Sequence, residues 1–258
     1  MEIIIENTEK TQSFVEIFQN MKSFTNAISI ILKEDKMYVQ GMDYAQVSMF
    51  ELSMMNSWFD VYKIEKEVVL GINVVIFAKI LGTHKSSQKI ILRLPNLDNL
   101  DISYISDDKE FNKDFRMPLI ELDNEQMNIT DFDFDLEFIM ASKKLKSTID
   151  EMTNFGENVN IDFKDDKIVL NVQSDTAGVM NTYIDIDDVD ECIISDDDDV
   201  SCSFTLKYMQ YMSNYFKVAK NVQLKFSKQY PMMCKYMLDE DGDNNYIRFY
   251  LAPKISEN

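Results

Sequence analysis

The sequence repeats itself, and this internal repeat constrains the fold more than any other feature. When the chain is shifted by 131 positions, Ile28 falls on Val159, and residues 28–49 (ISIILKEDKMYVQGMDYAQVSM) match residues 159–180 (VNIDFKDDKIVLNVQSDTAGVM). In both segments apolar and polar residues alternate on either side of a short turn of lysines and acids, which is the pattern of a β-hairpin. A chain that contains such a pattern twice is expected to fold into two similar modules.

A helical pattern precedes each hairpin. Apolar residues recur there at spacings of three and four, which predicts one helix around Phe14, Ile17, Phe18 and Met21 and another around Leu145, Ile149 and Met152. Ser13 and Ser142 are the predicted N-caps, because a serine hydroxyl can accept a hydrogen bond from a free backbone N–H.

The match continues downstream of the hairpins at nearly the same shift. Residues 73–81 match 205–212 as a second helix, and the strands 88–94 and 101–105 match 220–226 and 233–237. Each copy therefore contains two helices and many strands, so the predicted fold class is α+β. We expect an N-terminal domain at 1–117, a connector at 118–134 and a C-terminal domain at 135–258.

Length and composition set the outer limits on function. The chain has 258 residues, of which 45% are hydrophobic, so it can bury a sizeable core. Its formal net charge of −19 disfavours contact with phosphate unless the lysines are clustered. Three cysteines without CxxC spacing fit a reducing intracellular compartment. No stretch approaches the roughly 20 apolar residues that span a bilayer, so an integral membrane protein is not expected.

Several segments together resemble one family, the eukaryotic-type sliding clamps related to proliferating cell nuclear antigen. They are Gly71-Ile72-Asn73 with Ala78-Lys79-Ile80-Leu81, the loop from Met42 to Ser48, the connector with Glu121-Leu122-Asp123 and Glu125-Gln126, and the terminal Leu251-Ala252-Pro253-Lys254-Ile255. The resemblance covers essentially the whole chain, and the terminal LAPKI stretch is its most specific part.

This resemblance implies the DNA clamp fold and a non-enzymatic function. Two similar domains, each with two helices packed on antiparallel sheets, would form a subunit, and three subunits would close head to tail into a ring. The ring would encircle duplex DNA, keep a DNA polymerase processive and dock replication and repair proteins. The joining strands would lie near 112–117 and, in the neighbouring subunit, near 178–184; the implied interface residues are Phe111, Phe115, Met117, Gly178, Met180 and Tyr183.

The resemblance also implies that lysines on helices face the hole. Weak, sequence-independent contact with phosphates suits a protein that must slide. The candidate DNA-binding residues are Lys22, Lys79, Lys85, Lys143, Lys144, Lys146, Lys207, Lys217 and Lys220. Val15, Glu16, Asp150 and Asn214 stand where relatives commonly have basic residues, so a less positive channel is expected.

A second implied site is an apolar groove for short partner peptides. The matching residues are Met42, Gln46, Val47, Met49, Met127, Ile129, Pro231, Tyr250, Ala252 and Pro253. Such a surface suits a short helical turn with aromatic anchors, and methionines can repack around different partners. The implied partners are double-stranded DNA, a DNA polymerase, other proteins with such peptides and a clamp loader, and no cofactor or metal is expected. By the same resemblance, Lys164 lies in the loop region where eukaryotic clamps carry a regulatory lysine that is ubiquitinated. Nuclear localisation is implied, or a cytoplasmic viral factory if a virus encodes the chain.

Two other hypotheses remain open from the sequence. A clamp-fold processivity factor could act as a monomer or dimer through a basic face. A metal-dependent nuclease could use Asp131, Asp133 and Asp135, which a strand would place on one face. The acidic stretch at 239–243 lacks the Gly and Glu spacing of an EF-hand, and the single histidine, His84, is expected to be a surface side chain.

Overall fold

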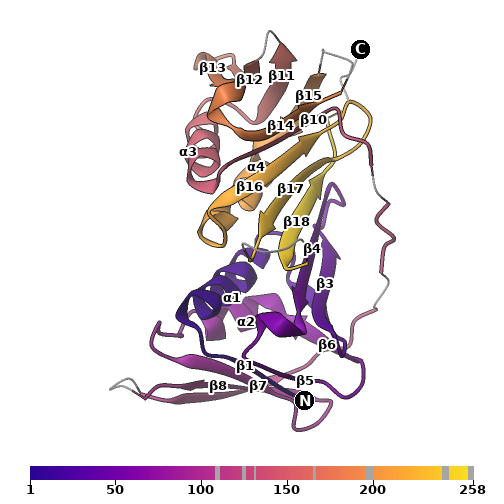
Figure 1. Cartoon of the computed structure of the whole chain (residues 1–258), viewed down its shortest axis with the longest axis vertical. Coiled ribbons are helices and arrows are strands. Elements are labelled where there is room, and N and C mark those ends of the chain that lie inside the picture. The colour runs from indigo at the N-terminus through magenta and orange to yellow at the C-terminus, as the bar shows by residue number, and fades with distance from the viewer. Residues whose placement is uncertain are drawn as a thin grey trace. The chain divides into compact units, whose positions relative to one another are not determined.

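The structure is a computed structural model of the whole chain and divides into two compact units (Figure 1). It describes residues 1–107, 111–123, 126–130, 132–164, 167–195, 200–239 and 244–254. Unit 1 comprises Met1–Tyr44, Phe50–Met127 and Leu238–Ile247, and unit 2 comprises Ala45–Met49, Asn128–Met237 and Arg248–Asn258.

Unit 1 contains two helices and two sets of strands. One sheet has the order β5-β1-β7-β8-β9, and the other strands follow the order β4-β3-β2-β6. The helices are α1 (Thr8–Met21) and α2 (Val74–Leu81). The strands are β1 (Glu2–Ile5), β2 (Ala27–Leu32), β3 (Lys36–Met42), β4 (Ser48–Met55), β5 (Val61–Lys63), β6 (Val68–Asn73), β7 (Lys89–Arg93), β8 (Asn99–Ile105) and β9 (Lys113–Pro118), with a 3₁₀ turn η1 (Asn56–Trp58) between β4 and β5.

Unit 2 is built from the same kinds of elements. Its helices are α3 (Ser142–Met152) and α4 (Leu206–Ser213), and its 3₁₀ turns are η2 (Ile186–Asp188) and η3 (Asn214–Lys217). Its strands are β10 (Leu136–Ala141), β11 (Asn158–Lys164), β12 (Lys167–Ser174), β13 (Gly178–Asp185), β14 (Asp190–Ile194), β15 (Val200–Thr205), β16 (Asn221–Phe226), β17 (Met232–Met237) and β18 (Tyr246–Leu251). The first two residues of β18 belong to unit 1, and the first two of β4 belong to unit 2.

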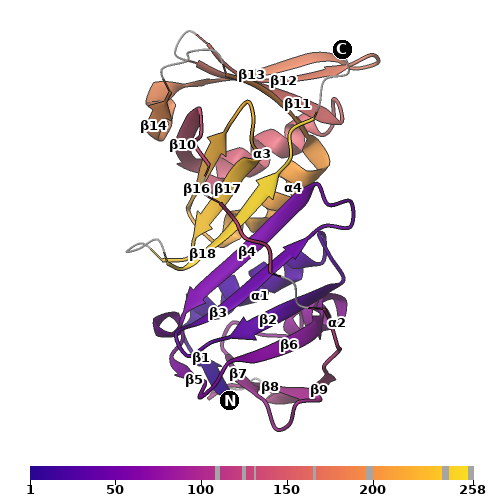
Figure 2. The ribbon, with the colours of Figure 1, turned by 90° about the vertical axis from the view of Figure 1, so that its right-hand side faces the viewer.

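The strand orders confirm the internal repeat. If elements are matched in chain order, β5-β1-β7-β8-β9 of the first copy becomes β14-β10-β16-β17-β18, and β4-β3-β2-β6 becomes β13-β12-β11-β15. The predicted hairpins are β2–β3 and β11–β12, both antiparallel (Figure 2). The predicted second helices are α2 and α4, capped by Asn73 and Thr205. Two modules with one topology therefore make up the chain, as the sequence predicts.

The helix α1 begins earlier than the apolar pattern indicates. Its N-cap is Asn7, whose side-chain oxygen accepts hydrogen bonds from the N–H groups of Glu9 and Lys10 at 2.9 and 3.1 Å. The predicted cap, Ser13, is therefore wrong: it lies within the helix. The first turn has no large apolar residue, and Thr11 occupies the buried position there. A pattern read from apolar residues alone misses that turn.

The start of α3 also differs from the prediction by one residue. Its N-cap is Ala141, and Ser142 is the first helical residue rather than the cap. The Ser142 hydroxyl is buried and has no hydrogen-bond partner in the described structure. The apolar stripe is correct, since Leu145, Ile149 and Met152 are buried.

Aromatic packing fixes the helices of unit 1 against each other. Phe18 on α1 lies 5.1 Å from Phe77 on α2, measured between ring centroids, in an edge-on arrangement, and Phe14 packs against both rings. All three side chains are fully buried. Such pairs add to the stability that area burial alone supplies. The exposed faces of both helices, which on α2 include Ile76 and Lys79, are thereby held in a fixed orientation.

Some predicted features lie outside the described residues. These are Glu125, Asp131, residues 240–243 of the acidic stretch and Ile255. The residues that are described between β9 and β10 form neither helix nor strand, and the predicted connector boundaries of 118 and 134 stay a prediction. None of the described helices is long and apolar enough to cross a membrane.

Candidate DNA and partner interfaces

The α-helices of the described chain are more basic than the rest of the protein. Together α1 to α4 contain six lysines and four acidic residues, a net charge of +2, whereas the whole chain has a net charge of −19. Affinity for a polyanion depends on where basic side chains lie rather than on net charge. The helices are therefore the best candidates for contact with phosphates.

The predicted DNA-binding lysines lie on these helices or beside them. On helices are Lys79 (α2), Lys143, Lys144 and Lys146 (α3) and Lys207 (α4). Lys22 is the C-cap of α1, Lys217 ends η3, and Lys85 and Lys220 lie in loops. Every one of them except Lys146 is exposed. The four helices thus present an exposed set of ammonium groups.

Lys146 differs because it is paired on its own helix. Its side chain is only 20% exposed, and its Nζ donates to both carboxylate oxygens of Asp150 at 2.5 Å. The side-chain amide of Gln210 on α4 donates to Oδ1 of the same carboxylate at 3.3 Å. The charge of Lys146 is therefore balanced within the protein.

Two other helical lysines lie against aromatic rings. Lys207 Nζ is 5.8 Å from the ring centroid of Tyr211, one turn further along α4. Lys10 Nζ on α1 donates to the carbonyl of Trp58 at 2.6 Å and lies 5.5 Å from the centroid of that ring. Lys10 is held against unit 1, so it is a poor candidate for phosphate contact despite its place on α1.

Aromatic side chains gather in unit 2 beside the C-terminal segment. Phe132 stacks on Tyr230 with 4.9 Å between ring centroids and meets Tyr250 edge-on at 6.4 Å. The guanidinium of Arg248 lies 5.5 Å from the centroid of the Tyr250 ring. Phe132 and Tyr230 are only partly buried or exposed, so this cluster presents aromatic surface.

The predicted groove residues divide between the two units. Met42 and Met127 belong to unit 1, whereas Gln46, Val47, Met49, Ile129, Pro231, Tyr250, Ala252 and Pro253 belong to unit 2. Within unit 2 the N–H of Ala252 donates to the carbonyl of Val47 at 2.9 Å, which joins the C-terminal segment to the loop before β4. Tyr250 is mostly buried at 8% exposure, while Val47, Gln46 and Ala252 are exposed.

The connector is attached to unit 1 at two points. The N–H of Ile120 donates to the carbonyl of Gly71 at 2.9 Å, and a Cβ at Gly71 would lie 1.9 Å from the carbonyl oxygen of Ile120. Only glycine permits this approach of the two backbones. Further along, the side-chain amide of Gln40 on β3 makes two hydrogen bonds with the backbone of Met127.

The strand β9 forms one edge of the sheet in unit 1, and three predicted interface residues lie on it or just before it. Phe111, just before the strand, is 86% exposed. Phe115 is partly buried and packs on Tyr104 with 5.5 Å between ring centroids. Met117 is buried in the core at 1% exposure, which leaves Phe111 and Phe115 as the side chains with accessible surface.

The strand β13 forms an edge of the four-stranded sheet in unit 2. Val179 and Tyr183 are 56% and 64% exposed, and Met180 is partly buried on the opposite face of the strand. Gly178 begins the strand with a φ of +84°, a conformation that favours glycine. An edge strand with exposed apolar side chains is a surface that another strand can pair with.

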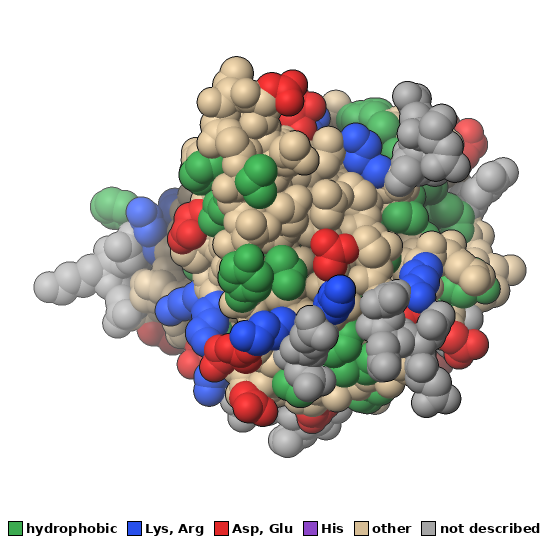
Figure 3. Space-filling view, turned by 90° about the horizontal axis from the view of Figure 1, so that it is seen from above, with side chains coloured by type: hydrophobic (Ala, Val, Ile, Leu, Met, Phe, Trp, Pro, Cys, Tyr) green, Lys and Arg blue, Asp and Glu red, His purple; other side chains and the backbone are tan. Residues whose placement is uncertain are grey.

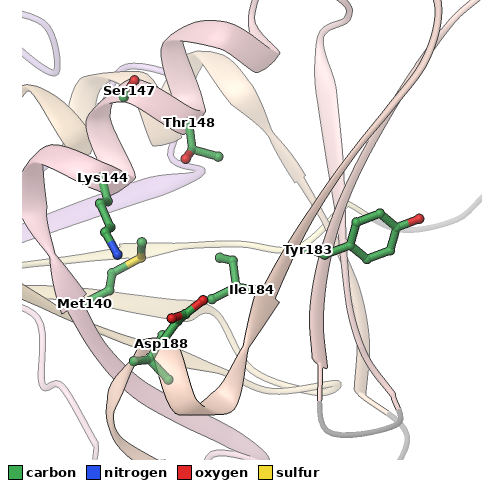
Figure 4. Close-up of a pocket in the computed structure, with 8 residues that line it drawn as sticks. Met140, Lys144, Ser147, Thr148, Tyr183, Ile184 and Asp188 are labelled. Carbon is green, nitrogen blue, oxygen red and sulfur yellow. The ribbon is translucent and has the colours of Figure 1, made fainter.

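A hollow of about 280 Å³ lies beside this edge (Figure 4). Its lining comes from β10, α3, β13 and the segment after it, as Met140, Lys144, Ser147, Thr148, Tyr183, Ile184, Asp188 and Val189. The ring of Tyr183 projects away from the other labelled side chains.

The surface seen from above carries charged side chains of both signs (Figure 3). Basic side chains gather there in a band with acidic ones among them, and hydrophobic side chains form separate groups.

Family profiles match both halves of the sequence. The profile described as "Proliferating cell nuclear antigen, N-terminal domain" covers residues 5–126, and that described as "Proliferating cell nuclear antigen, C-terminal domain" covers residues 128–254. The chain belongs to the proliferating cell nuclear antigen (PCNA) family. Its fold and family are those of DNA sliding clamps, whose members are generally not enzymes.

Named relatives agree with this assignment. The chain is 24% identical to "Proliferating cell nuclear antigen 2" of Plasmodium falciparum, over 95% of this chain and 97% of that protein. It is 23% identical to "Proliferating cell nuclear antigen" of Caenorhabditis elegans, over 94% of this chain and 93% of that one. A solved structure, that of a PCNA2–PCNA3 complex from Sulfolobus tokodaii, matches with a TM-score of 0.87 at 20% identity, over 98% of this chain and 99% of that one. This last match confirms the clamp fold.

Neither the PCNA family nor its fold supports the nuclease hypothesis. Residues 132–134 do not form a strand, so the described aspartates are not aligned on one strand face as predicted. The carboxylate of Asp135 instead accepts the N–H of Lys228 at 2.8 Å. Among the described residues, no three His, Cys, Asp or Glu side chains gather in a way that could hold a metal ion.

The remaining reactive groups are engaged in packing. His84 is partly buried rather than a surface side chain, with its Nε2 2.6 Å from the carbonyl oxygen of Gln88 and its ring edge-on to Tyr104. Burial lowers the pKa of His84, and the charge of Lys113 lowers it further, against the opposing effect of the Gln88 carbonyl. Burial raises the pKa of Cys202 to about 11 and that of Cys234 to about 12, so both thiols are protonated at neutral pH.

Sequence reasoning missed several residues of these surfaces. Phe132 and Tyr230 join the aromatic cluster around Tyr250, and Val179 is exposed on β13 beside the predicted residues. Strand alternation on β13 could have indicated Val179, because it lies two and four residues before Asn181 and Tyr183 on the same face. The contact of Gln40 with Met127 joins residues 87 positions apart, and no local pattern indicates it.

Proposed function

We propose that three copies of this chain close head to tail into a ring around duplex DNA and tether a DNA polymerase to it. The observation that carries this proposal is the correspondence between the two units. The strand β9 is the counterpart of β18, and β13 is the counterpart of β4. The edge strands β9 and β13 are thus related by the repeat to β18 and β4, whose ends are joined by a hydrogen bond within unit 2.

The contact within unit 2 gives the kind of junction to expect. There the residue directly after β18, Ala252, donates its N–H to Val47, the residue directly before β4. Pairing β9 of one copy with β13 of the next would repeat that relation between subunits, with Phe111 and Phe115 on one side and Gly178, Met180 and Tyr183 on the other. Such a contact is heterologous, because it joins two different surfaces of the subunit. It generates a closed ring when the rotation from each subunit to the next adds up to a full turn. Three subunits of two modules each would give six similar modules around the hole.

The exposed lysines of the helices would line the hole and contact phosphates without reading sequence. Lys146 on α3 is paired with Asp150, and on α1 Val15 and Glu16 stand where relatives commonly have basic residues. This contact is therefore weak, which suits sliding. Retention then depends on closure of the ring more than on affinity for DNA. A trimer would carry a net charge of three times −19, or −57, which disfavours spontaneous loading. A clamp loader is therefore part of the proposal, as is action in the nucleus, or in a cytoplasmic viral factory if the chain is viral.

The aromatic cluster of unit 2 is the proposed docking site for partner peptides. Phe132 and Tyr230 offer aromatic surface beside the mostly buried Tyr250, and the exposed Val47 and Ala252 offer apolar surface next to them. A short peptide with aromatic anchors matches this chemistry. DNA polymerases and other replication or repair proteins that carry such peptides would share the site in turn.

Retention on DNA of different topology tests the proposal. The protein is loaded by a clamp loader onto a nicked circular plasmid and separated from free protein at high salt, with and without cutting of the plasmid by a restriction enzyme. A ring is retained on the circle, because salt weakens phosphate contact without opening the ring, and it runs off the linear form. Equal loss from both forms would mean that a monomer or dimer binds DNA through a basic face instead.

A further inference from the structure

Of the three lysines on α3, two are exposed and one is held in an ion pair within the protein. Lys143 and Lys144 are exposed, but Lys146, on the same helix, is four-fifths buried and hydrogen-bonded to both oxygens of Asp150. Gln210 on α4 donates a further hydrogen bond to that carboxylate. Asp150, itself hydrogen-bonded by Gln210 from the other helix, thus holds Lys146 away from solvent.

We infer that Asp150 is a positioning residue that withdraws Lys146 from DNA and so sets how weakly the α3 face holds phosphate. This inference rests on the proposed function, because it takes α3 to line the hole. The geometry explains the effect. A lysine bound to a carboxylate through charge-assisted hydrogen bonds must lose them before it can reach a phosphate, and Gln210 fixes the carboxylate on the side of α3 that faces α4.

The same helix provides a matched comparison. Glu151 is the next residue, is exposed and carries the same charge, but its Oε1 accepts a hydrogen bond from the hydroxyl of Ser147 at 3.0 Å rather than from a lysine. Neutralising either acid removes one negative charge from nearly the same place. Only neutralisation of Asp150 also releases a lysine.

The test is a double-mutant comparison in the full-length protein. Binding of a short fluorescein-labelled linear duplex is measured by fluorescence anisotropy over a range of salt concentrations, for wild type, Asp150→Asn, Glu151→Gln, Lys146→Gln and the double variant Lys146→Gln with Asp150→Asn. Asparagine keeps an oxygen for the Gln210 amide, so the link between α3 and α4 is retained.

Release of Lys146 should add one phosphate contact. The slope of log affinity against log salt then steepens by about 0.9 in Asp150→Asn relative to Glu151→Gln, and affinity at low salt rises by about threefold or more over that control. Lys146→Gln alone leaves the slope near that of wild type. In the double variant the extra slope disappears, because no lysine is left to release. A purely structural role of Asp150 would not change the salt slope in this way.

Other outcomes separate this inference from the proposed function. The variants Lys143→Gln and Lys144→Gln are measured in the same assay. Equal slopes for Asp150→Asn and Glu151→Gln, with weaker binding by these two lysine variants, would overturn the role of Asp150 but keep α3 as a DNA-facing helix. If none of these variants changed DNA binding, the claim that α3 faces DNA would be wrong, and so would the role inferred for Asp150.

Discussion

Gln40 and Met127 form a reciprocal pair of hydrogen bonds. The Nε2 of Gln40 donates to the Met127 carbonyl at 3.0 Å, and its Oε1 accepts the Met127 N–H at 2.8 Å. A side-chain amide here satisfies one donor and one acceptor of the connector, much as a neighbouring strand would. Met127 is one of the predicted groove residues, so Gln40 holds part of that surface in place on unit 1.

Replacing Gln40 by alanine should release the connector locally. A net loss of about 1 kcal/mol for the two exposed hydrogen bonds corresponds to about fivefold faster hydrogen exchange at the Met127 amide, measured by mass spectrometry. Gln12→Ala, an exposed change on α1, is the control and should leave that exchange unchanged. Unaltered exchange in Gln40→Ala would show that the connector is held by other contacts.

Gly71→Ala should destabilise the protein, because the new Cβ would lie 1.9 Å from the backbone oxygen of Ile120. Since backbone must shift to admit it, we expect a loss of about 1–3 kcal/mol in the free energy of unfolding, measured by urea denaturation. Gly82→Ala is the matched control. Its Cβ would first meet the flexible side chain of Gln19 at 3.1 Å, and its φ of −64° suits alanine. That variant should change stability by less than about 1 kcal/mol.

Tyr183→Lys should weaken association of subunits. Tyr183 is 64% exposed on the free edge of β13, and a lysine there would place a strongly hydrated charge in the proposed interface. We expect dissociation at least about tenfold more favourable, measured by analytical ultracentrifugation over a concentration series. Leu97→Lys alters a side chain that is 76% exposed between β7 and β8 and should leave association as in wild type. Similar behaviour of both variants would remove β13 from the interface.

The pH dependence of stability should carry a signal from His84, the single histidine. Burial lowers its pKa in the folded protein below the ordinary value of 6.5, so the unfolded chain binds its proton more readily. The stability that this group contributes is fully present above pH 6.5 and is lost as the pH falls through that value toward the lower folded pKa. Urea denaturation at several pH values should show this loss in wild type and not in His84→Gln. A wild-type profile identical to that of the variant would contradict the shift.

The sequence predicts the parts of this fold that depend on local patterns. Alternation identified both hairpins, and spacings of three and four placed Phe14 and Leu145 on buried helix faces, because side-chain direction follows directly from backbone period. The Ser13 cap was wrong because a helix turn without large apolar residues gives no periodic signal, although Asn7 is itself a strong cap residue.

The candidate sites depend more on contacts between distant residues. The lysines could be placed on helices from sequence, and the spacing of four between Lys146 and Asp150 permits an ion pair. Whether a pair forms depends on Gln210 from another helix and on burial, which no spacing reports. In the same way, Phe132 stacks on Tyr230, which lies 98 positions further along the chain, so no local pattern predicts this contact.

The central claim, that copies of this chain close into a ring of three, is tested most directly by its mass in solution. Size-exclusion chromatography with light scattering should give about 91 kDa, three times the 30.2 kDa of one chain, and this mass should hold across the eluting peak. A mass of one or two chains at every concentration would contradict the ring, however well the separate units match the clamp fold.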